Sequence, residues 1–182
     1  MAAVGFDLYS RLLAEAVETR KASMEGRAPI VEAPQAVVDL PVEAHLPTEY
    51  VPEEAQKLEL YRRLARARTS GDLAAFRQEL LDRYGPMPDA VVRLVEVAEL
   101  RLAAEAAGIA SISREEGWLV VRFGSGLTRS TAMALLSGPA LPGLRANDVT
   151  FASNQVRLRL PADARKAWPL TQAVVARLSA PS

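Results

Sequence analysis

The spacing of hydrophobic residues divides the chain into helical and extended segments. In residues 5–22, apolar side chains recur every three or four positions, which predicts an amphipathic helix. The stretch that follows contains a glycine and two prolines and shows no clear period, which predicts a linker. We therefore expect a helical arm in residues 1–25, a linker in residues 26–36 and a compact domain in residues 37–182.

The compact domain is expected to begin with a strand and to continue with three helices. Residues 37–46 alternate apolar and polar side chains, and Pro41 lacks a backbone donor, so this strand should lie at the edge of a sheet. Helical spacing then returns, with a glycine after the second and third helices as a stop signal. The predicted helices cover residues 53–68, Ser70 to Gly85, and residues 89–107.

Short β-branched and aromatic runs replace the helical pattern after residue 108. They predict two hairpins with a short helix between them, followed by a last helix. Grouped helices and grouped strands predict an α+β fold rather than βαβ units, with a helix cluster packed with a small, mostly antiparallel sheet. The hairpins cover residues 109–113 with 118–123 and 149–151 with 156–160, and the helices cover residues 127–136 and 163–179.

The composition is typical of a globular protein with no overall preference for anions or cations. Hydrophobic residues make up 49% of the chain, and 22 basic residues balance 22 acidic ones. Because dedicated nucleic-acid binders usually carry a basic excess, this balance argues against DNA binding by the chain alone, although it permits a local basic patch. The chain has no cysteine, no membrane-spanning apolar run and no signal peptide pattern, so we expect a cytoplasmic protein without membrane contact.

Residues that could perform chemistry are few. No glycine-rich nucleotide-binding motif is present, and the single histidine, His45, has no second histidine or cysteine with which to hold a metal. The adjacent carboxylates Glu53/Glu54 and Glu115/Glu116 would point in different directions on regular structure. We therefore expect no catalytic residue, no cofactor and no metal, and the chain is not expected to be an enzyme by itself.

The most basic segment of the chain is RRLARAR at 62–68. Its residues Arg62, Arg63 and Arg66 are candidates for phosphate contact, which gives a second hypothesis of an accessory nucleic-acid-binding domain. No aromatic residues are interleaved for base stacking. We favour the simpler interpretation that this is a solvated helix face, partly paired with acidic residues such as Glu59.

Three segments resemble one family, the bacterial transcription-repair coupling factors. GFDLYSRLLAEAV at 5–17 is similar to the end of the family's helicase motor. VDLPVEAHLPTEYVPEEAQKLELYRRLARA at 38–67 is similar to the opening of its last domain, and ELLDRYGPMPDAVVRLVEVAELRLAAEAAGI at 79–109 resembles a later E-L-x-D-R stretch with the following helix. The resemblance covers roughly residues 5–123 and indicates a C-terminal domain of the type found in this family.

The resemblance implies a parent protein that removes stalled RNA polymerase with an ATP-driven translocase on double-stranded DNA. Such a protein recruits UvrA for nucleotide excision repair through an N-terminal module that resembles UvrB. The C-terminal domain would be regulatory rather than catalytic, packing on the UvrB-like module and masking it in the resting factor. Residues 1–25 would then belong to the translocase motor domain that precedes it.

The masking contact in the family is associated with the E-L-x-D-R stretch, which corresponds here to Glu79, Asp82 and Arg83. Their i, i+3, i+4 spacing predicts that the three side chains share one exposed helix face. Several charges that meet a complementary basic patch would supply specificity. The alternative is that Asp82 and Arg83 only cap the helix or pair locally near Gly85.

Overall fold

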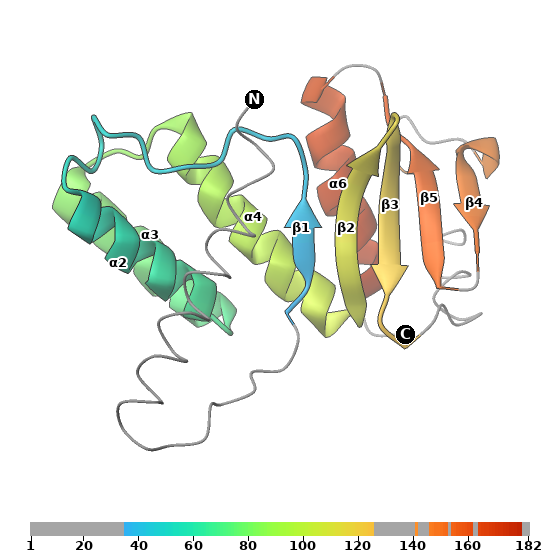
Figure 1. The fold of residues 1–182 in the computed structure, drawn as a ribbon, viewed down its shortest axis with the longest axis horizontal. Helices are drawn as coiled ribbons and strands as arrows, with labels where there is room; N and C mark the ends of the chain where they lie inside the picture. The colour runs from blue at the N-terminus through green and yellow to red at the C-terminus, as the bar shows by residue number, and fades with distance from the viewer. Residues whose placement is uncertain (1–34, 126–140, 142–145, 153, 162–163, 180–182) are drawn as a thin grey trace. The chain divides into compact units, whose positions relative to one another are not determined.

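The computed structural model describes residues 35–125, 141, 146–152, 154–161 and 164–179. Helices and one mixed sheet form an α+β fold, as predicted (Figure 1). The predicted N-terminal arm, most of the predicted linker and the predicted short helix between the two hairpins lie outside the described residues.

The described residues fall into two compact units. The first unit covers residues 41–99 and the second covers residues 35–40 together with the described part of 100–179. The boundary between them falls within helix α4 (Asp89–Ala106). The predicted domain boundary at residue 37 remains a prediction.

The first unit consists of helix α2 (Glu54–Arg66), helix α3 (Ser70–Tyr84) and the first part of α4. All three predicted helices are confirmed to within a few residues. Each helix turns its apolar stripe inward, and burial of these side chains is the main stabilising term for the unit. The enclosed side chains include Leu60, Leu64, Leu73, Phe76, Leu80, Val91, Leu94 and Val95.

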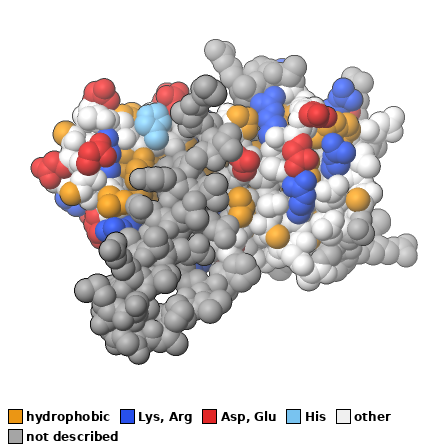
Figure 2. Space-filling model, viewed as in Figure 1, with side chains coloured by type: hydrophobic (Ala, Val, Ile, Leu, Met, Phe, Trp, Pro, Cys, Tyr) orange, Lys and Arg blue, Asp and Glu red, His pale blue; other side chains and the backbone are white. Residues whose placement is uncertain are grey.

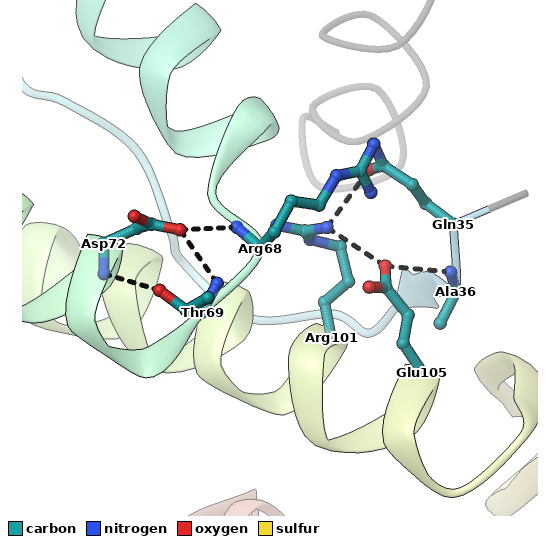
Figure 3. A network of polar contacts seen from close by, with 7 residues as sticks. All are labelled: Gln35, Ala36, Arg68, Thr69, Asp72, Arg101 and Glu105. Atoms are coloured by element: carbon teal, nitrogen blue, oxygen red, sulfur yellow. Dashed lines mark hydrogen bonds and ion pairs between the residues drawn. The ribbon is translucent and has the colours of Figure 1, made fainter. Parts of the chain in front are cut away.

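Both ends of α3 are fixed by local interactions that the sequence encodes. At the start, Thr69 Oγ1 accepts a hydrogen bond from the Asp72 N–H at 3.1 Å, and the Asp72 carboxylate accepts from the N–H groups of Arg68 and Thr69, each at 2.9 Å (Figure 3). This capping box lowers the pKa of Asp72, chiefly through the Arg68 N–H. At the other end, Gly85 has φ 81° and its N–H donates to the Leu81 carbonyl at 3.0 Å.

The second unit contains a five-stranded sheet with the strand order β1-β2-β3-β5-β4. β1 pairs with β2 in parallel at one edge, and every other neighbouring pair is antiparallel. Both predicted hairpins and the predicted edge strand are therefore confirmed. The strands are β1 (Val37–Asp39), β2 (Ile109–Glu115), β3 (Trp118–Phe123), β4 (Val149–Phe151) and β5 (Gln155–Arg159).

One face of this sheet is apolar and packs against helix α6 (Ala164–Ser179), which lies behind the strands in Figure 1. Leu119 pairs with Leu158 across β3 and β5, so both side chains point to this face, and neither is exposed to solvent. On the helix, the Trp168 side chain is also buried. A proline in this stretch of the sequence is expected either to break the last helix or to mark its start, but Pro169 lies inside α6.

A buried cation holds the chain where it enters the second unit (Figure 3). The Arg101 side chain is 7% exposed and donates hydrogen bonds to Glu105 Oε1 at 3.0 Å and to Gln35 Oε1 at 3.1 Å. The same Glu105 oxygen lies 3.3 Å from the Ala36 N–H, which donates to it. Because a buried charge needs its acceptors, this cluster fixes the segment before β1 against α4.

Two details of the predicted fold are wrong. The predicted strand over 37–46 ends after its first three residues, shortly before Pro41, because proline cannot donate to a strand ladder. The helical spacing over 53–68 predicts an outer position for Lys57, but this residue is buried. Its Nζ donates to Thr48 Oγ1 at 2.9 Å and to Glu54 Oε1 at 3.0 Å, so the charge is satisfied beside the core.

Candidate partner interface at the end of helix α3

Glu79 lies at the centre of an ionic cluster within the first unit. Its carboxylate forms an ion pair with Arg63 of α2 and accepts a second hydrogen bond from Arg83 Nη1, one turn further along α3, at 2.9 Å. The Glu79 side chain is 23% exposed. The hydrogen bond from Arg63 is the largest cause of a lowered pKa for Glu79, so the ion pair favours the ionised carboxylate.

Asp82 differs from Glu79 in that it has no cationic partner among the described residues. It is exposed, and its Oδ1 accepts a hydrogen bond from Gln78 Nε2 at 2.8 Å. The preceding Leu81 is 39% exposed, which makes it one of two large hydrophobic residues exposed in the described part of the chain. Arg83 is exposed as well, and its guanidinium carbon lies 5.2 Å from the centre of the Tyr84 ring. We call Leu81, Asp82 and Arg83 the α3 surface.

The backbone under the α3 surface is held by two tyrosines that the sequence reasoning missed as structural residues. The buried Tyr50 hydroxyl lies 3.1 Å from the carbonyl oxygen of Leu80 and 3.0 Å from that of Gly85, and these two acceptors share its single proton. Burial raises the pKa of Tyr50. Tyr84 packs against Tyr50 with ring centres 5.6 Å apart, and its hydroxyl donates to Gln56 Oε1 at 2.7 Å. The end of α3 is therefore a rigid support for exposed charges.

The predicted shared face of Glu79, Asp82 and Arg83 divides into two parts in the structure. Glu79 and Arg83 pair with each other locally, while Asp82 stays outside that pair. The local pairing of Arg83 matches the alternative that the sequence left open. It also separates the roles of the two carboxylates, because Glu79 joins α2 to α3 and Asp82 is directed to solvent.

The three arginines considered for phosphate contact occupy different environments. Arg63 is engaged with Glu79. Arg62 is partly buried, and its Nε is enclosed without a hydrogen-bond partner among the described residues. Arg66 is exposed at the end of α2. The segment does not present three equivalent solvated cations, as phosphate tracking along a helix would require.

The remaining candidates for chemistry stay isolated in the described part of the chain. His45 is exposed, and the described residues contain no group of three or more histidine, cysteine or acidic residues that could hold a metal ion. Among the same residues, no helix has the length and apolar character to cross a membrane. The α3 surface is therefore the strongest candidate site in the first unit.

A family model described as the TRCF domain matches residues 40–133, just over half of the chain. The chain belongs to the TRCF domain family. The match includes helices α2, α3 and α4 and the hairpin of β2 and β3, so the α3 surface lies inside the TRCF domain. The resemblance read from the sequence motifs is thereby confirmed.

Curated relatives of this TRCF domain carry the family's printed name. The chain is 44% identical over 119 residues to the "Transcription-repair-coupling factor" of Mycobacterium tuberculosis, an alignment that covers 62% of this chain and 10% of that protein. It is 38% identical over 117 residues to the protein of the same name from Staphylococcus aureus, covering 64% of this chain and 10% of that protein. The alignments thus span about a tenth of the relatives' length.

A solved structure described as "Crystal structure of C-terminal domain of transcription-repair coupling factor" has the same fold. The TM-score is 0.65 at 16% sequence identity, and the superposition covers 80% of this chain and 94% of the other. It therefore extends beyond the residues matched by the family model, and it supports the α+β fold of the TRCF domain.

Proposed function

We propose that this TRCF domain is a regulatory domain that acts by protein contact and performs no catalysis itself. It would serve a transcription-repair coupling factor by packing its α3 surface on the UvrB-like, UvrA-binding module and masking that module. The observation that carries the proposal is the arrangement at the end of α3, where exposed Leu81 and Asp82 are supported by buried tyrosine and ionic contacts. Cytoplasmic location is part of the same proposal.

The chemistry of the α3 surface suits a reversible contact. An exposed leucine beside a carboxylate with no cationic partner among the described residues offers a small apolar anchor and one directional charge. Exposed charge pairs contribute on the order of 0.2–1 kcal/mol each, so a few of them set the register of an interface without making it permanent. A masking contact has to be opened by a competing event, and a modest differential affinity allows this.

Glu79 has a different part in this proposal. Its carboxylate is occupied by Arg63 and Arg83, so it positions the helix end and aligns the Arg83 guanidinium rather than meeting the partner. Asp82 then makes the direct contact with a basic group of the UvrB-like module. Exchange of either residue would weaken binding, but only exchange of Glu79 would also weaken the fold of the first unit.

The wider context follows from the same proposal. The parent protein would bind RNA polymerase, UvrA and double-stranded DNA and hydrolyse ATP in a translocase motor that lies outside this domain. Residues 1–25 would form a helix of that motor and residues 26–36 a linker. Engagement of polymerase and DNA by the motor would release the masked module, so that repair proteins are recruited only at a stalled polymerase.

The proposal is tested by binding of the 182-residue chain to the UvrB-like module, supplied as a separate polypeptide from the same organism. Asp82→Arg is expected to weaken binding about tenfold or more, because an attractive contact becomes repulsive. Glu59→Arg changes the net charge equally at an exposed site on α2 and serves as the matched control. Wild-type binding by Asp82→Arg, with unchanged melting, would remove the α3 surface from the interface.

A further inference from the structure

The face of the sheet turned away from α6 carries charged side chains. Figure 2 shows basic and acidic groups interspersed over the strands on the side facing the viewer. Successive side chains of a strand point to opposite faces of the sheet, and paired residues of neighbouring strands share a face. The strand register therefore assigns residues to this face. They include Ser113 and Glu115 of β2, Trp118, Val120 and Arg122 of β3, and Arg157 and Arg159 of β5.

Trp118 and two arginines of β5 form a compact cluster on this face, at the end where β2 turns into β3. Trp118 lies directly opposite Arg159, and Arg157 lies opposite Val120, the next outward position. The guanidinium carbons of Arg157 and Arg159 are 5.4 Å and 5.5 Å from the centre of the indole ring. Both arginines therefore stack on one tryptophan, which orients the guanidinium groups and limits their side-chain freedom.

Neither of these two arginines forms an ion pair with any described carboxylate. Arg122, two positions along β3 from Val120, provides the contrast within the same face. Its Nη2 lies 2.7 Å from Glu115 Oε1 and its Nη1 lies 3.2 Å from Ser113 Oγ. The hydrogen bond from Arg122 is the largest cause of the lowered pKa of Glu115. Among the described residues, Arg122 thus has a hydrogen-bonded carboxylate, whereas Arg157 and Arg159 have none, although the charge of Arg157 also helps to lower the pKa of Glu115.

We infer that Trp118, Arg157 and Arg159 form a docking site for an extended acidic segment of a protein, with carboxylates at alternate positions. Arg157 and Arg159 are two residues apart on a strand, so their backbone positions are about 6.6–6.8 Å apart. Alternate residues of an extended partner have the same separation, and a planar guanidinium donates two parallel hydrogen bonds to a carboxylate. The half-buried Trp118 ring beside them offers apolar area to the aliphatic part of the partner's side chains. The site belongs to the second unit and shares no residue with the α3 surface, which belongs to the first.

Charge on the rest of the face favours a protein segment over a nucleic acid. Glu115 and, at the β1 edge, Asp39 lie on the same face, and Arg122 is already neutralised by Glu115. A polyanion needs a continuous basic track and loses affinity steeply where carboxylates interrupt it. A peptide with two or three spaced carboxylates needs only the two oriented arginines. Mixed charge of this kind supplies specificity between protein partners.

The site is tested with a fluorescein-labelled peptide of about ten residues in which glutamate and threonine alternate, a length that spans the strand with residues to spare. Its affinity for the whole chain is measured by fluorescence anisotropy at low salt. We expect the double variant Arg157→Ala/Arg159→Ala to weaken binding about tenfold or more. The double variant Arg157→Lys/Arg159→Lys should weaken it severalfold, because lysine keeps the positive charge but cannot donate two parallel hydrogen bonds to one carboxylate. Melting curves of both variants confirm that the sheet is intact.

Two controls make the result decisive. Arg114→Ala removes an exposed arginine of β2 whose register places it on the opposite side, with Leu119, and should leave the affinity within about twofold. A peptide of the same composition with its glutamates in one block should bind more weakly than the alternating peptide. Equal binding of both peptides, an equal effect of Arg114→Ala, or tighter binding of a single-stranded oligonucleotide of matching length would overturn the inference.

Discussion

Arg63 of helix α2 and Glu79 of helix α3 form an ion pair that joins the two helices at the end of α3. Arg83 shares the same carboxylate. Because Glu79 faces α2, it is less exposed than Asp82 and Arg83 of the same E-L-x-D-R stretch. Glu79 is paired within the unit, while Asp82 is exposed and accepts a hydrogen bond only from Gln78 among the described residues.

Glu79→Gln is expected to lower the free energy of unfolding by about 0.5–1 kcal/mol, since it removes the charge of a half-exposed ion pair between helices. Glu99→Gln is the matched control, because Glu99 pairs with Arg77 at a more exposed site, with side chains 48% and 38% exposed. It should cost less than about 0.5 kcal/mol. Urea unfolding of the three proteins measures the difference. An equal cost for both substitutions would contradict the structural role of Glu79.

The same ion pair predicts a dependence of stability on pH. The folded pKa of Glu79 lies below its ordinary value of 4.5, so the unfolded chain binds a proton at Glu79 more readily than the folded one. The stabilisation is therefore fully present above about pH 5 and is lost as the pH falls through the folded pKa. The stability gap between wild type and Glu79→Gln should be constant near neutral pH and shrink below about pH 4.5. A gap that widens on acidification would show that the sign is wrong.

Gly85→Ala is expected to destabilise the chain by about 1–3 kcal/mol, because Gly85 has φ 81° with ψ −157°, a region that residues with a Cβ avoid. A Cβ at this position would meet nothing within 4 Å, so the cost would be conformational rather than steric. Gly71→Ala is the control inside α3, where an added Cβ makes an ordinary contact and should stabilise by about 0.5–1 kcal/mol. Thermal unfolding distinguishes the two, and a loss at both sites would refute this explanation.

Tyr50→Phe is expected to cost about 1–2 kcal/mol, because it removes the one hydroxyl proton that the Leu80 and Gly85 carbonyls share, in a buried position. Tyr84→Phe removes a hydroxyl that bonds a partly exposed glutamine and should cost less. Tyr50→Phe should also weaken binding of the UvrB-like module modestly, since the backbone under the α3 surface loses its support. Chemical denaturation and the binding assay measure the two effects, and a smaller cost at Tyr50 than at Tyr84 would contradict the order.

Local signals made most elements of the fold predictable. The Thr69–Asp72 capping box and Gly85 mark the ends of α3 through residues close together in the sequence, so no distant contact is needed to find them. The strand at 37–46 was predicted too long, because alternation alone does not show where pairing with β2 stops. Lys57 was placed outside, because its partner Thr48 lies on a loop whose path the helical period does not encode.

The candidate site was predicted only in part. The sequence singled out Glu79 and Arg63 for two different functions, and only the fold shows that they bind each other. Tyr50 gave no sign of its role, because its acceptors lie 30 and 35 residues away. Similarly, the alternation of Arg157 and Arg159 is visible in the sequence, but their stacking on Trp118 depends on the pairing of β3 with β5.

Competition with UvrA tests the proposed masking most directly. The UvrB-like module is immobilised, UvrA is supplied at its half-saturating concentration, and the 182-residue chain is titrated in. The proposal predicts that the chain displaces UvrA, that Asp82→Arg needs about tenfold more protein to do so, and that Glu59→Arg acts like wild type. If UvrA stayed bound at concentrations where the chain saturates the module, the two proteins would occupy different surfaces, and the proposed masking would be wrong.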